Sequence, residues 1–415
     1  MKIFSRCSQA RLGWALGLAL TALVSQPVQA LVQDITAEFR PDPTNPASNK
    51  FVNTTPETGI CPWHIPAKCK QLNMFSIRVP FTAASNAPIQ AFHTDPRKGV
   101  MFQLPSAWRD VDLQHESGEI HRLQMRIAGV GGRWNLERPP GVSAWTIPGA
   151  NWDQQWRQAP SPCIGSGYIA AWINYALFFW IVPENATICA RYPGFDIPWL
   201  NFSMLEFAYE LKTPNPLKMP DGIYTGQLNY SMGPGKDFDF GDVIIPTEDV
   251  FTFNFKVSVD HILKVEIPPG GRRVELQPQG GWQAWLNHGR KPARLFQDQT
   301  FNLYASSAFK MQMECEFPMG NTCGIRDAVS GESVPLQVAV TLPFGLTNGA
   351  GQAVNRQPLR LDGAGTERFD PSQYVDRKPG TLHFEVRRED VEGMLRPGES
   401  RTYSGAVTVI WDSQV

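Results

Sequence analysis

Two segments of this chain repeat one strand motif, and they lie in different halves of the sequence. Residues 223–230 follow the turn at residues 220–222, and residues 403–411 follow a turn at Pro397 and Gly398. Each segment carries a tyrosine, a glycine and then apolar residues on alternate positions, which is typical of a half-buried β-strand. A strand motif that recurs near the end of each half predicts two tandem β-sandwich domains, expected over residues 31–245 and 246–415.

The amino-terminal residues have the features of a secretory signal peptide. A basic start with Lys2, Arg6 and Arg11 precedes an apolar run over residues 12–24, and small residues such as Ala30 follow. The apolar run is too short for a membrane anchor, and a soluble helix is the alternative. We therefore expect residues 1–30 to be removed and the mature chain to be exported.

Cysteine spacing indicates three disulfides in the exported chain. Of the seven cysteines, Cys7 leaves with the leader, and an even number in an exported protein is typical of disulfides. No Cys-x-x-Cys zinc motif occurs. Spacing does not fix the connectivity, but it favours pairing neighbours: Cys61 with Cys69, Cys163 with Cys189, and Cys315 with Cys323.

Composition favours an all-β chain without a nucleic-acid footprint. The formal net charge is −1, whereas nucleic-acid binding requires a basic excess. Glycine and proline number 35 each and aromatic residues make up 11%, which suits many turns and large core side chains. The most apolar segment, residues 168–182, is shorter than a membrane span and is expected to be core, either as two strands turning near Asn174 or as one buried helix.

A long alternating run defines the second half. From residue 251 to residue 267 every odd position is apolar except His261, and this is too long for one ordinary strand. We expect a first strand that bends near Asp260 and His261 and passes from one sheet of the second sandwich to the other.

With its signal peptide, this long switching strand and the closing segment at residues 397–409, the chain resembles a two-domain tip adhesin of chaperone–usher fimbriae. The resemblance implies a pilin-like second domain, an immunoglobulin-like sandwich that lacks its last strand. Its open groove would be edged by Phe253, Phe255, Val257, Tyr403, Val407 and Val409. The close spacing of Cys315 and Cys323 departs from many pilins, in which a disulfide joins distant strands.

The resemblance also implies partners and a location. A sandwich that lacks a strand must borrow one, first from a periplasmic chaperone and then from the next pilus subunit after an outer-membrane usher has admitted it. The chain would reach the fimbrium tip on the cell surface, and its first domain would bind a receptor glycan or protein. Because the chain ends four residues after Trp411, we expect no further strand of its own there.

Two rival functions are weighed against an adhesin. A structural pilus subunit would begin with a free donor strand. Residues 31–39 show weak alternation and could serve as that strand, although the chain is long for a single sandwich. A secreted hydrolase would need a catalytic triad or paired carboxylates, and the sequence offers none. We therefore expect no catalysis and no cofactor.

Candidate binding residues cluster in the first domain. Aromatic rings that stack on sugars and arginines that hold acidic groups occur together there, although for any single tryptophan a place in the core is the favoured alternative. The candidates are Arg133, Trp134, Arg138, Trp145, Trp152, Trp156 and Arg157. His115 and His121 are weak metal-ligand candidates, since only a turn at residues 117–118 would bring them together; a solvated hairpin is the alternative.

Overall fold

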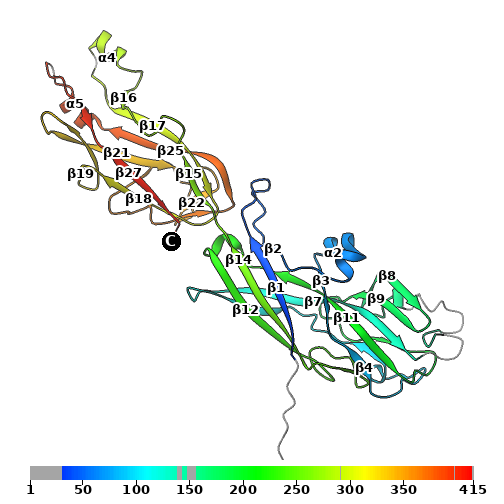
Figure 1. Cartoon of the computed structure of the whole chain (residues 1–415). Coiled ribbons are helices and arrows are strands. Elements are labelled where there is room, and N and C mark those ends of the chain that lie inside the picture. The colour runs from blue at the N-terminus through cyan, green and yellow to red at the C-terminus, as the bar shows by residue number, and fades with distance from the viewer. Residues whose placement is uncertain (1–29, 138–142, 147–155, 290, 397, 414–415) are drawn as a thin grey trace, which may run out of the picture.

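The computed structural model describes residues 30–137, 143–146, 156–289, 291–396 and 398–413. Nearly all regular structure in it is β, in two bodies that each have their own apolar core (Figure 1). The predicted signal peptide, apart from Ala30, lies outside the described residues. Among the described helices, none is long and apolar enough to cross a membrane.

The first body is built on one large curled sheet with the strand order β13-β4-β11-β7-β6-β12-β14-β1-β2, to which β3, β8 and β9 add, while β5 and β10 form a separate pair. Short helices α1 (Ile60–Trp63) and α2 (Pro66–Leu72) cover one side. The strands are β1 (Ala30–Phe39), β2 (Val52–Asn53), β3 (Phe75–Val79), β4 (Ala83–Ser85), β5 (Val100–Phe102), β6 (Arg109–His115), β7 (Ile120–Leu136), β8 (Ile164–Trp172), β9 (Tyr175–Ile181), β10 (Cys189–Arg191), β11 (Leu200–Lys212), β12 (Gly222–Ser231), β13 (Ile244–Pro246) and β14 (Val250–Val259).

The second body is a sandwich whose larger sheet has the order β15-β17-β25-β21-β20-β19, and whose facing layer contains the pair β18–β27. Helices α4 (Gln283–His288) and α5 (Arg388–Met394) are short. The strands are β15 (Leu263–Glu266), β16 (Gln277–Pro278), β17 (Leu295–Ala305), β18 (Lys310–Cys315), β19 (Pro318–Met319), β20 (Thr322–Asp327), β21 (Ser333–Thr341), β22 (Leu346–Asn348), β23 (Gln357–Pro358), β24 (Phe369–Pro371), β25 (Val375–Val386), β26 (Tyr403–Ser404) and β27 (Val407–Asp412).

The sequence predicted that residues 251–267 form one long strand of the second sandwich. The structure instead divides this run between the two bodies. Its first part is β14, whose Phe251, Phe253 and Phe255 are at most 2% exposed in the core of the first body. Its last part is β15, which pairs with β17 in the second body. The bend predicted near Asp260 is therefore the link between the bodies, and the boundary expected after residue 245 moves to residues 260–262. Both segments alternate because each is half-buried in its own sheet.

The amino-terminal strand completes the first body. β1 runs parallel to β14 with all ten residues in register, from Ala30 opposite Val250 to Phe39 opposite Val259. Ile35 and Phe39 are each 1% exposed, because the apolar side chains of β1 enter the same core as those of β14. The segment predicted as a possible free donor strand is thus used inside its own domain.

The most apolar segment, residues 168–182, lies beside the glycines of β7 in the first body. Residues 168–182 contain the end of β8 and all of β9, which form a hairpin closed by Trp172 opposite Tyr175, so the two-strand alternative is confirmed. The glycines at 129, 131 and 132 lie inside β7. A Cβ at Gly131 would come within 2.5 Å of the Phe179 ring, so glycine lets β9 pack closely on this strand.

The three disulfides join the cysteines that the spacing favours. Cys61 pairs with Cys69 and joins α1 to α2. Cys163, just before β8, pairs with Cys189, the first residue of β10, so this bridge spans the β8–β9 hairpin. Cys315 pairs with Cys323 and ties β18 to β20 across the second body. Each bridge closes a short loop, which stabilises the fold mainly by restricting the unfolded chain.

His261 fastens the short link between the bodies. Its Nε2 lies 2.8 Å from the carbonyl oxygen of Met219 and must donate there, while its Nδ1 lies 3.1 Å from Oγ of Ser306. The backbone N–H of the neighbouring Ile262 donates to the same Ser306 hydroxyl at 2.9 Å. Met219 belongs to the first body and Ser306 to the second, so one side chain bonds to both.

We predict that His261→Ala opens this link. The loss of one or two hydrogen bonds, each worth about 1 kcal/mol, should raise the local opening equilibrium about tenfold. Limited proteolysis followed by mass spectrometry should show correspondingly faster cleavage near residues 259–263. His93→Ala, at a half-buried histidine whose Nδ1 lies against the carbonyl oxygen of Asp95 in the same body, is the matched control; equal cleavage rates in both variants would contradict a fastening role for His261.

Candidate functional site

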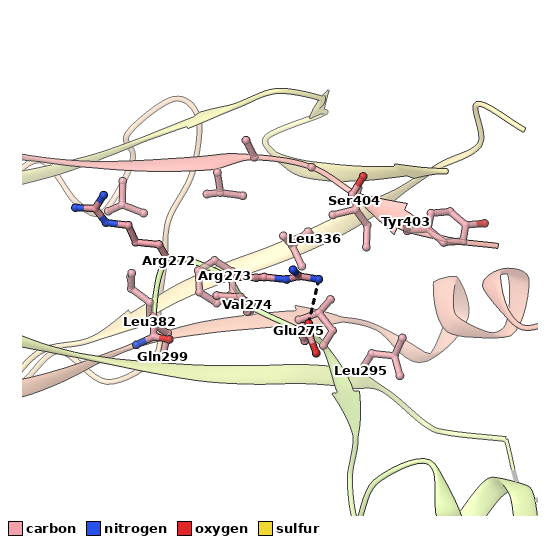
Figure 2. A pocket seen from close by; sticks show the side chains of 18 of the residues that line it. Arg272, Arg273, Val274, Glu275, Leu295, Gln299, Leu336, Leu382, Tyr403 and Ser404 are labelled. Carbon is pink, nitrogen blue, oxygen red and sulfur yellow. Dashed lines mark ion pairs between the residues drawn. The ribbon is translucent and has the colours of Figure 1, made fainter. Parts of the chain in front are cut away.

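The second body contains an open groove with a cavity of about 990 Å³ between its two layers. Its floor is apolar and is formed by Phe301 of β17, Leu336 of β21, and Leu382 and Phe384 of β25. One wall is β15 with the segment that follows it, residues 267–276, and the opposite wall is β26 with β27. Figure 2 shows side chains from both walls directed into the space between them.

The two strands that flank the groove each have a partner on one edge only, within the part of the chain that the structure describes. β27 pairs with β18 through residues 407–412, and β15 lies at the end of the larger sheet, paired with β17. Each strand therefore presents a row of backbone N–H and C=O groups toward the groove. Such edges are a template for another extended segment.

The apolar side chains along the groove are only partly covered. Val407, Val409 and Trp411 of β27 are half-buried, and Ile267 opposite them is 45% exposed. Trp411 packs on Phe301 and Phe309 with ring centroids 5.0 and 5.6 Å apart. In the first body, by contrast, the apolar residues of β14 are buried, and β1 pairs along the edge of that strand. The second core thus has the apolar surface of a sandwich, but the described residues supply no strand that closes it between β15 and β27.

Charged residues lie at the rim of the groove. Arg401, whose side chain is 13% exposed, pairs with both Glu332 and Glu399. Arg273 pairs with Glu275 at 3.3 Å on the opposite wall. Arg272 is exposed beside this pair and has neither an ion pair nor a hydrogen bond among the described residues.

Asp327 fixes the approach to β26 and thereby one end of the groove. Its carboxylate accepts hydrogen bonds from the backbone N–H of Thr402 at 3.0 Å and from the N–H and hydroxyl of Ser330 at 2.8 and 2.7 Å. These donors, first those of Ser330 and then Thr402, hold the pKa of Asp327 below its ordinary value because they stabilise the charged form.

We predict that Asp327→Asn lowers the melting temperature of the second body at neutral pH. Because the pKa of Asp327 is depressed in the folded state, its stabilisation is present above the unfolded-state pKa of about 3.9 and is lost as the pH falls through the folded-state pKa. Thermal unfolding of the chain with an extended segment fused after Val415 to fill the groove, measured between pH 7 and pH 2, should therefore show a difference between wild type and variant that shrinks in acid. A constant difference across this range would contradict the assignment.

Half of the predicted groove-edge residues line the groove. Tyr403, Val407 and Val409 do so, and they lie on β26 and β27. Phe253, Phe255 and Val257 do not, which corrects the prediction: they are buried in β14 of the first body, at 2% exposure or less. Sequence reasoning missed the true opposite wall at Val265 and residues 267–276. Its signal was the break of the alternation at residues 268–271 by two prolines and two glycines.

The tryptophan-rich stretch of the first body contributes mainly to its core. Trp134, Trp145 and Trp156 are fully buried, with ring centroids 5.0–5.8 Å apart. Arg133 is half-buried, with its guanidinium 4.4 Å from the centre of the Tyr175 ring, and Arg157 is exposed. Arg138 and Trp152 lie outside the described residues. Of the described candidates, only the two arginines reach the surface.

His115 and His121 come together through the turn between β6 and β7, but each is engaged elsewhere. Both rings pack on Tyr224, at centroid distances of 4.7 and 5.6 Å. The Nε2 of His115 lies 3.0 Å from the carbonyl oxygen of Asp221, and that of His121 lies 2.7 Å from Glu119. The described residues contain no group of three or more side chains that could hold a metal ion.

Comparisons with known proteins give distant likeness among solved structures. No protein-family model matches the chain, and no curated protein matches it significantly. Among solved structures it is similar to the CsuC–CsuE chaperone–tip adhesion subunit pre-assembly complex of the archaic chaperone–usher Csu pili of Acinetobacter baumannii. The match covers 93% of this chain and 98% of that chain at 8% identity, with a TM-score of 0.21. A likeness this weak carries no inference about this chain.

Proposed function

We propose that this protein is a fimbrial tip adhesin whose second domain accepts a strand from another polypeptide. The observation that carries the proposal is the groove between β15 and β27, an apolar cavity between two strand edges that each lack a partner among the described residues. An inserted strand satisfies both rows of backbone groups and covers the apolar floor with alternate side chains. In the export pathway the strand would come first from a periplasmic chaperone and then, after passage through an outer-membrane usher, from the next pilus subunit.

An extended peptide fits this groove better than a small molecule does. The cavity is at the upper limit of small-molecule pockets, which usually supply a few convergent polar groups. Here the floor is aliphatic and aromatic, the charged side chains belong to the walls and the rim, and main-chain groups run along both walls. Main-chain hydrogen bonding over the length of a strand is the way in which sheet edges recognise peptides.

The use of β1 supports the tip position over the alternative of a shaft subunit. A shaft subunit accepts one strand and donates another, whereas the candidate donor at residues 31–39 is hydrogen-bonded to β14 along its whole length. Withdrawing β1 would expose the apolar side chains of Leu31, Ile35 and Phe39 and uncover the phenylalanines of β14. Within the described residues, the chain is therefore equipped to accept a strand but not to donate one.

Receptor binding belongs to the first domain in this proposal. Its strands are complete, so its surface is free to recognise a glycan or protein, and Arg133 with Arg157 are the candidate contacts that the structure leaves accessible. No feature of the described residues favours catalysis, so a secreted hydrolase has no supporting observation.

We predict that an added strand rescues the second domain. The mature chain produced alone should aggregate, because an open edge over an apolar groove pairs with other chains. A segment of about ten residues with alternate apolar side chains, fused after Val415 through a turn linker, should restore a soluble monomer with cooperative unfolding. A matched fusion whose apolar residues are replaced by serine is the control. A soluble, cooperatively folded chain without any added strand would refute the proposal.

We further predict that Arg133→Ala and Arg157→Ala weaken receptor binding without unfolding the first domain. Binding of the strand-completed chain to glycan and matrix-protein arrays would identify the receptor and measure the effect. Trp156→Ala should instead destabilise the domain by about 3–5 kcal/mol, because it empties part of the core. Unchanged binding in both arginine variants would place the recognition site elsewhere.

A further inference from the structure

We propose that the strand accepted by the groove carries an acidic side chain, at an outward-facing position opposite Arg272. This inference rests on the proposed function and concerns the chemistry of the partner rather than the existence of the groove. It begins from the wall that follows β15, where residues 267–276 bulge away from β17 before pairing resumes at β16. Figure 2 shows Arg272 and Arg273 extending from this segment within the groove.

Arg272 is the cation of the groove that has no counterion. Arg401 is neutralised by Glu332 and Glu399, and Arg273 by Glu275, which is the single acidic residue among those lining the groove. Arg272 pairs with none of the described residues. The groove therefore presents one uncompensated positive charge to whatever occupies it.

Strand geometry fixes where the partner's carboxylate must lie. Successive side chains of an extended strand point to opposite faces, so the apolar residues that enter the core alternate with residues at the rim. Arg272 is an exposed side chain of the wall and does not belong to the floor, which Phe301, Leu336, Leu382 and Phe384 form. The matching acidic residue thus stands between two inward apolar residues, where both charges remain hydrated and ionised.

The expected contribution is to selectivity more than to total stability. Ion pairs at such exposed positions contribute about 0.2–1 kcal/mol, far less than burying the apolar side chains. A basic residue at the same position would be repelled by Arg272. The charge would therefore discriminate between donor strands that share the same apolar pattern.

The test uses the full chain with a strand fused after Val415. The fused strand is made once with a given sequence and once with that sequence reversed. The inward apolar residues are kept, and each outward position is changed in turn to Glu, Gln and Lys, with the melting temperature of the second domain as the readout. At one outward position we expect the melting temperature to be highest with Glu, lower with Gln and lowest with Lys, with steps of about 1–4 °C. High salt should reduce these differences.

Charge reversal identifies the partner residue. Arg272→Glu should invert the order at that one position, and Arg272→Gln should abolish it, whereas Arg387→Glu, at an exposed arginine outside the groove, should leave it unchanged. If the apolar strands rescue folding equally with all three residues at every position, this inference fails and the proposed function stands. If no fused strand rescues folding, the proposed function fails and this inference falls with it.

Discussion

In the second domain, the two strands that flank the groove each leave one edge of backbone groups without a hydrogen-bonding partner among the described residues. The rest of this domain's structure follows from these two open edges. β27 and β15 each pair with a single neighbouring strand. The apolar cavity between them is bounded below by the floor residues and is open on its other side. Backbone groups left without partners over an apolar cavity are costly, since water satisfies them only while the apolar surface stays wet. In the proposed function, a strand supplied from outside would remove both costs at once, so assembly and completion of the fold would be the same event.

The first domain shows what such completion achieves. β1 supplies ten residues parallel to β14, and the phenylalanines beneath are buried to within 2% exposure. The half-exposed Val407, Val409 and Trp411 of β27 show the same type of surface before it is covered. In the proposed function, the two domains would thus differ less in their apolar pattern than in where the closing strand comes from.

Sequence periodicity was sufficient for the fold class and for several elements, but not for the assignment of strands to domains. Alternation predicted β14, β15 and β27 as strands, and cysteine spacing favoured the pairs that form. It could not show that a run of seventeen residues is divided between two cores, because period-two patterning reports half-burial and not the identity of the facing sheet. For the same reason Phe253 and Phe255 were assigned to the groove. The tryptophans show the corresponding limit for side chains, since composition alone does not separate a stacking platform from a core.

In the proposed pilus, the link between the domains would place the groove in the path of mechanical load. The chain leaves the first core at Val259, passes the bonds of His261 to Met219 and Ser306, and enters β15 at Leu263, which pairs with Ala305 beside Ser306. β15 is also a wall of the groove. In the proposed pilus, a pull on a receptor-bound first domain would reach the second domain through this wall. A donor strand paired with β15 would then share that load through many main-chain hydrogen bonds, whereas β15 alone is held by four residue pairs to β17. Completion of the sandwich would therefore reinforce the one strand through which the two domains are joined.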